Sequence, residues 1–204
     1  NIFTKETWTS DEVVGILTQL KDGVIGGQQF PFRYKSAYDM LGAENFDHKT
    51  KVLDALEECM DISVANFPKL KGKSLSFVDN SGSCAATNPS LRSKMRMSTI
   101  GNLSGIITAM QSEDEGYVGI FGDRYHEYPV SKRNGVLSQL KEVERIGNGI
   151  GGGTEAGVWI GLDQAIKNGT HYDNIFIYSD MQAGHGGLYG RDGVIKDHAT
   201  RGGY

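Results

Sequence analysis

The chain has 204 residues and a formal net charge of −4, a length that accommodates one domain and a smaller attached piece. This charge excludes a uniformly basic protein that coats nucleic acid, although a local basic patch is compatible with it. Two distant cysteines, Cys59 and Cys84, fit neither a zinc nor a disulfide framework, so we expect a reducing, cytoplasmic location. Because no apolar run approaches the length of a membrane span, we expect no membrane partner.

The opening segment is predicted to be helical. Thr9 and Glu12 have the spacing of a capping box, and apolar residues then recur on one helical face. We expect this helix to end at Gly23, and Gly26 and Gly27 to form a break.

Two further helices follow before the chain changes character. Pro31 suits the first turn of a second helix. Its inner side is expected to carry Phe32, Ala37, Tyr38 and Leu41. A third helix, residues 49–67, places its apolar side chains at helical spacing. That apolar face comprises Val52, Ala55, Leu56, Cys59, Met60 and Ser63. Three such helices cover one another poorly, so we expect them to end a HEAT-like helical-repeat array.

From Ser74 onward, strands alternate with helices. The sequence predicts strands at 75–78, 117–121, 126–130 and 175–178, and helices at 97–110, 135–146 and 157–167. Such alternation is typical of a Rossmann-like α/β fold, a mostly parallel sheet with helices on both faces. Ligands bind such sheets at the carboxyl ends of the strands.

Oxygen-bearing side chains follow two of these strands. Asp79, Ser81 and Ser83 form a D-x-S-x-S motif directly after the first strand, and Asp180 follows the strand at 175–178. Thr154 lies between them in a glycine-rich loop. Carboxylates and hydroxyls suit a hard divalent cation, so these five residues are the predicted ligands of Mg²⁺ or another divalent cation. The alternative is a turn without a metal, in which the Asp79 carboxylate accepts hydrogen bonds from nearby backbone amides.

The ligand types favour recognition over catalysis. Neutral hydroxyls leave the cation much of its charge, so a carboxylate or phosphate from a partner can complete its coordination. A magnesium phosphatase usually has a second carboxylate two residues after the first, where this chain has Ser81. We therefore predict that the protein is not an enzyme. The glycine-rich segment 147–153 follows a helix and carries no Walker lysine, which argues against a nucleotide loop.

A basic cluster, Arg92, Lys94 and Arg96, follows the metal motif. It is either a solvated loop before a helix or a surface that neutralises RNA phosphates beside the metal.

Several segments together resemble the Ro autoantigen family, whose members combine a helical-repeat TROVE module with a von Willebrand factor A domain. The segments that carry the resemblance are residues 29–41 and 51–67, the strand and D-x-S-x-S loop at 74–84, the hairpin at 116–130, the G-G-G-T-E loop at 151–155 and the S-D-M-Q-A-G stretch at 179–184. The metal motif is similar to the metal-ion-dependent adhesion site of von Willebrand factor A domains, and the resemblance covers nearly the whole chain.

The resemblance implies a ring of helical repeats that is closed by the A domain. Small structured RNAs would bind the outer surface of this ring, and the single-stranded 3′ ends of misfolded RNAs would enter its central hole. Residues 1–70 would then be the last TROVE helices and residues 71–204 the A domain. We expect the chain to be incomplete, because the A domain stops after the strand at 175–178 and leaves an apolar edge. The alternative function is a protein-adhesion or assembly module, in which an acidic residue of a partner protein fills the metal.

Overall fold

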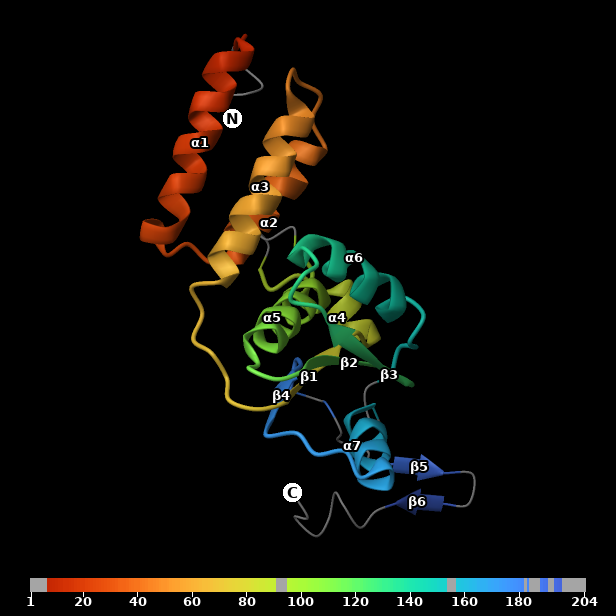
Figure 1. Ribbon diagram of the computed structural model, residues 1–204. Helices are drawn as coiled ribbons and strands as arrows, with labels where there is room; N and C mark the ends of the chain where they lie inside the picture. Colours follow the sequence, from red (N-terminus) through yellow and green to blue (C-terminus); the bar gives the residue numbers. More distant parts are fainter. Residues whose placement is uncertain are drawn as a thin grey trace. The chain divides into compact units, whose positions relative to one another are not determined.

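The computed structural model describes residues 7–90, 95–153, 157–181, 183, 188–190 and 193–195 (Figure 1). The chain forms two compact units: Asn1–Pro68 with Gly135–Leu137, and Lys69–Asn134 with Ser138–Tyr204. Within the described residues, none of the helices has the length and apolarity that crossing a membrane requires.

Three helices build the first unit, and α3 packs against both others. They are α1 (Ser10–Gly27), α2 (Pro31–Gly42) and α3 (Lys49–Val64). The predicted capping box is confirmed, because the N–H of Thr9 donates to the Glu12 carboxylate at 2.9 Å and the N–H of Glu12 donates to the Thr9 hydroxyl at 3.4 Å. The predicted apolar face of α3 is buried along its length. The helix itself is shorter than predicted, because residues 65–67 form a tight turn after Val64.

The end of α1 differs from the prediction. The helix passes through Gly23 and continues to Gly27, and Gln28 then adopts the left-handed conformation with φ 47°. A glycine inside a helix costs only about 1 kcal/mol relative to alanine, which burial of a neighbouring side chain can offset. Val24 is fully buried and stabilises the last turn of α1, which the sequence pattern did not predict.

The buried face of α2 is also turned from its predicted position, although Pro31 does begin the helix. Tyr34 and Lys35 are buried together with the predicted Leu41. Lys35 buries its aliphatic stem while its ammonium group pairs with Asp39, so a residue that looks polar in the sequence belongs to the inner face. The remaining residues predicted for that face, Phe32, Ala37 and Tyr38, are only half-buried.

The second unit is built on a four-stranded sheet in the order β3-β2-β1-β4. The strands are β1 (Ser74–Asp79), β2 (Gly116–Phe121), β3 (Tyr125–Val130) and β4 (Asn174–Tyr178). β1 is parallel to both β2 and β4, whereas β3 is antiparallel to β2. The predicted mostly parallel α/β sheet is therefore confirmed. A separate two-stranded sheet pairs β5 (Leu188–Gly190) with β6 (Gly193–Ile195).

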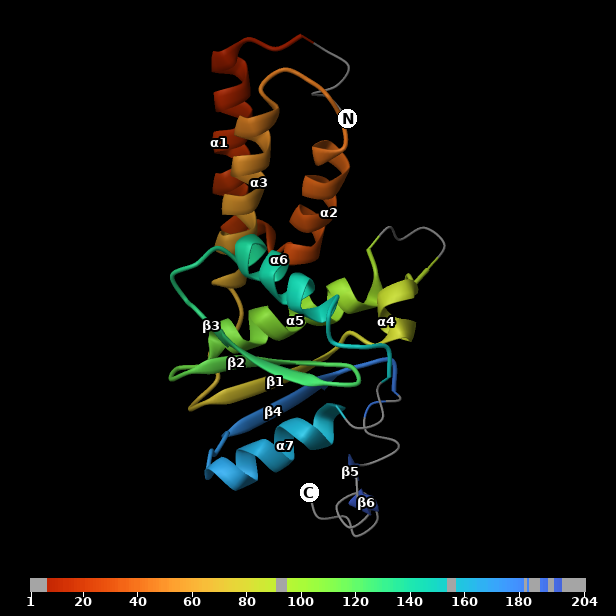
Figure 2. The same cartoon turned by 90° about the vertical axis from the view of Figure 1, so that its right-hand side faces the viewer.

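Helices cover both faces of this sheet, as predicted. They are α4 (Gly82–Ala86), α5 (Met97–Gln111), α6 (Val136–Gly147) and α7 (Gly157–Asn168). α5 and α6 lie over one face and α7 over the other (Figure 2). The short helix α4, which the sequence pattern did not predict, follows β1 directly.

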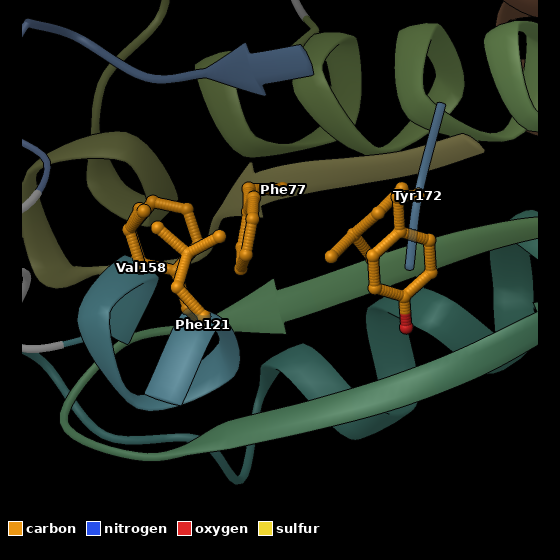
Figure 3. Close-up of a cluster of buried hydrophobic side chains, with 6 residues drawn as sticks. Phe77, Phe121, Val158 and Tyr172 are labelled. Carbon is orange, nitrogen blue, oxygen red and sulfur yellow. The ribbon is translucent and has the colours of Figure 1, made fainter. Parts of the chain in front are cut away.

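Alternate residues of β1 face the two helical layers. Phe77 lies in an apolar cluster under α7, with Phe121 and Val158 beside it (Figure 3). A Cβ atom at Gly161 of α7 would lie 2.6 Å from the Phe77 ring, so glycine is required for the close approach of helix and sheet. On the opposite face, the missing side chain of Gly105 leaves room for Val78.

β4 is an edge strand of the sheet, and two of its apolar side chains are exposed. Ile175 is 46% exposed and Ile177 is 52% exposed, although their partners in β1, Leu75 and Phe77, are completely buried. The apolar face of the sheet therefore continues into solvent at this strand.

Candidate divalent-cation site

Two acidic residues meet at the carboxyl edge of the sheet, as the sequence predicts. Asp79 ends β1, and Asp180 lies just beyond β4, the parallel neighbour of β1. The hydroxyl of Ser179 donates to Oδ2 of Asp79 at 2.7 Å and thereby joins the two strand ends. Because β2 and β4 lie on opposite sides of β1, this is the switch point where open α/β sheets bind their ligands.

The motif serines lie in the turn that leads from β1 into α4. The backbone N–H of Ser81 donates to Oδ1 of Asp79 at 2.9 Å, and the hydroxyls of Ser81 and Ser83 lie 3.3 Å apart. Asp79 and Ser81 are each 1% exposed, whereas Ser83 is exposed. Ser81 is therefore buried beside the carboxylate, whereas Ser83 is open to solvent.

The sulfur atom of Cys84 lies close to the two carboxylates. One oxygen of Asp79, one oxygen of Asp180 and Sγ of Cys84 all lie within 4.8 Å of one another. Desolvation and the nearby charge of Asp79 raise the pKa of the Cys84 thiol to about 12, so the thiol is neutral at pH 7 without a metal. The sequence analysis assigned no role to Cys84, because one cysteine beside a D-x-S-x-S motif matches no known ligand spacing.

These donors fit a divalent cation. Among the described residues, Oδ1 of Asp180 is buried and has no hydrogen-bond partner. A buried carboxylate oxygen without a partner is unfavourable, and so are two carboxylates held close together. A cation between them would satisfy the free oxygen and neutralise the repulsion.

The glycine-rich loop lies against the metal motif. The N–H of Gly82 donates to the carbonyl of Gly152 at 2.9 Å, which joins the two loops directly. The carboxylate of Asp123, just after β2, accepts from the N–H groups of Gly152 at 3.0 Å and Gly153 at 2.7 Å. Asp123 thus positions the loop, a role that the sequence analysis missed. Thr154, the fifth predicted ligand, lies outside the described residues.

Two buried asparagines, Asn80 and Asn102, hold the backbone of the metal motif in place. The side chains of Asn80 and Asn102 exchange two hydrogen bonds of 2.8 and 3.0 Å, and the N–H of Asn80 donates to the carbonyl of Phe121 at 2.8 Å. These bonds fix the backbone between Asp79 and Ser81. Sequence reasoning could not find this pair, because Asn102 lies on α5 and nothing in its local pattern distinguishes it.

Only one residue of the predicted basic cluster can be placed. Arg96 is exposed and immediately precedes α5. The next residue, Met97, donates its N–H to the carbonyl of Thr87 at 2.8 Å, so this start of the helix is held close to the end of α4. Arg92 and Lys94 lie outside the described residues.

The sheet and its carboxyl-edge cluster define a Rossmann-like α/β domain with a candidate divalent-cation site. Neither protein-family models nor curated proteins match this sequence. The fold is similar to the crystal structure of the RO (RSR) protein of Deinococcus radiodurans, with a TM-score of 0.62 and 16% identity. The match covers 85% of this chain and 36% of that protein. The expected likeness to Ro is therefore supported at the level of the fold, and the chain spans about a third of that protein's length.

Proposed function

We propose that this chain is part of a Ro-like RNA-binding protein that holds a divalent cation at the carboxyl edge of its sheet. The observation that carries the proposal is the fold match to the Ro protein. A match to 85% of the chain is longer than the larger unit alone, so it includes residues of both units. An isolated α/β sheet of common type would account for the second unit only.

The cation has a recognition role in this proposal. Ser81 and Ser83 would contribute neutral hydroxyls, so the bound ion would keep much of its charge and attract an anionic oxygen from a partner. The exposed Ser83 marks the side from which a phosphate oxygen can approach. Ser81 occupies the position at which a phosphatase has its acid and base, which favours a non-enzymatic scaffold over a hydrolase in this proposal.

The direct test is to purify the protein from its native source, extract any nucleic acid and sequence it, with and without chelator in the wash. Discrete small RNAs are expected to remain bound. Loss of these RNAs in chelator would place the cation in the RNA contact. A protein free of nucleic acid, with an absorbance ratio at 260 and 280 nm typical of protein alone, would contradict the proposal.

A salt titration can test the basic segment. If Arg96 neutralises a phosphate, Arg96→Ala lowers the slope of log affinity against log salt by about 1. The matched control is Arg133→Ala, which removes another exposed arginine of the same unit and is expected to leave the slope unchanged. Equal slopes for both variants would remove Arg96 from the RNA surface.

The second candidate function is capture of an acidic protein partner, and the exposed hydroxyl of Ser83 favours it equally. A partner carboxylate and an RNA phosphate offer the same anionic oxygen to the cation. Magnesium-dependent binding of a protein by material that carries no RNA would support this function in place of the first.

A further inference from the structure

The cluster at the carboxyl edge contains a ligand that hard cations do not use. Cys84 lies on α4, is 3% exposed and holds its sulfur within 4.8 Å of oxygens from Asp79 and Asp180. Mg²⁺ and Ca²⁺ bind oxygen ligands almost exclusively, whereas thiolates select zinc and other thiophilic ions.

The surroundings of this sulfur differ from those of a packing cysteine. A structural thiol usually lies among apolar side chains, whereas the sulfur of Cys84 lies within 4.8 Å of an oxygen from each of two carboxylates.

An independent observation points to a cation at the same place. Oδ1 of Asp180 is buried and, within the described part of the chain, has no hydrogen-bond donor. The sulfur and the two carboxylates together offer three ligands, the number that open zinc sites commonly supply.

We propose that Cys84, Asp79 and Asp180 bind a thiophilic divalent cation, Zn²⁺ in the cell, and leave one coordination position open to a partner's oxygen. The inference rests on the metal site of the proposed function and changes the identity of the ion. When the metal–sulfur bond forms, the thiol proton passes to bulk water. Mg²⁺ would bind the same loop through oxygen alone.

Cobalt provides the direct probe, because Co²⁺ replaces Zn²⁺ and a Co²⁺–thiolate bond absorbs in the near ultraviolet. Addition of Co²⁺ to the full, metal-free chain is expected to produce this charge-transfer band, and Zn²⁺ is expected to abolish it. Cys84→Ser should remove the band and weaken Zn²⁺ binding by about 10-fold or more. Cys59→Ser is the matched control, because Cys59 lies in α3 of the other unit, and it should keep the band.

A second variant guards against loss of the fold. Asp180→Asn retains the sulfur, so it should keep the band at saturating Co²⁺ and show weaker binding. A band that persists in Cys84→Ser, or Co²⁺-dependent thermal stabilisation without any band, would overturn the inference and leave an oxygen-only metal site intact. Failure of Co²⁺, Zn²⁺ and Mg²⁺ alike to stabilise the protein would overturn the metal site itself, whereas the test of RNA binding stands apart from both.

Discussion

Substitution of Asp79 by asparagine is expected to stabilise the metal-free protein and to remove most of the stabilisation that metal provides. Asp79 is almost completely buried, and one of its oxygens lies within 4.8 Å of an oxygen of Asp180. Two negative charges at that separation repel by about 1 kcal/mol with water-like screening and by about 3 kcal/mol at an effective dielectric constant of 20. Asparagine removes this repulsion.

Asparagine can also keep the hydrogen bonds that the carboxylate makes with Ser81 and Ser179. Its carbonyl oxygen can accept from the N–H of Ser81, and its amide can donate to the hydroxyl of Ser179, which then reverses its role. In chelator, Asp79→Asn should therefore raise the free energy of unfolding by about 1 to 3 kcal/mol.

Metal offsets most or all of this difference between the two proteins. At a free metal concentration 100 times the dissociation constant, the native protein gains about 2.7 kcal/mol. For a chain of this size that gain corresponds to an increase in Tm of about 5 to 10 °C. The variant lacks one carboxylate ligand and should show little of this increase.

Thermal unfolding in chelator and in Mg²⁺ or Zn²⁺ measures both effects. Asp114→Asn, which neutralises an exposed aspartate of the same unit, is the control and should change stability by less than about 0.5 kcal/mol in either condition. If Asp79→Asn destabilises the metal-free protein and retains the full metal-dependent increase in Tm, Asp79 stabilises the turn after β1 and does not bind a cation.

Three further substitutions test the core and the loop. Phe77→Ala should lower the free energy of unfolding by about 3 to 5 kcal/mol in urea denaturation, because the ring fills the cluster under α7. Gly161→Val should cost about 1 to 3 kcal/mol in the same assay, since its Cβ would lie 2.6 Å from the rings of Phe77 and Tyr125; Gly15→Ala in α1, where space is free, should not destabilise. Asp123→Ala should weaken metal binding by about 10-fold without a large change in stability in chelator, measured by metal-dependent thermal shift, and unchanged affinity would show that the loop does not support the site.

The sequence was sufficient for the sheet because three of its four strands are short, largely apolar runs bounded by turn residues. The predicted meeting of Asp79 and Asp180 needed only one topological rule, that parallel strands end at the same edge. The face of α2 could not be predicted in this way, because burial of Lys35 depends on its ion pair with Asp39 and not on its hydropathy.

The supporting residues of the site were harder to predict than its candidate ligands. Asp123, Asn102 and Cys84 act through contacts that form only when separate elements pack together. None of them has a local spacing that marks its role. A motif search therefore finds the D-x-S-x-S loop but misses the residues from other elements that contact it.

The hydrogen bond from Ser179 to Asp79 connects the end of the edge strand β4 to the end of the central strand β1. Among the described strands, β4 pairs only with β1, and it exposes Ile175 and Ile177, so local unfolding can detach it more readily than the central strands. An ion bound by both Asp79 and Asp180 would hold the carboxyl ends of β1 and β4 together. Metal occupancy would then set how often this margin of the sheet opens, and slower amide hydrogen exchange in β4 with metal would report it.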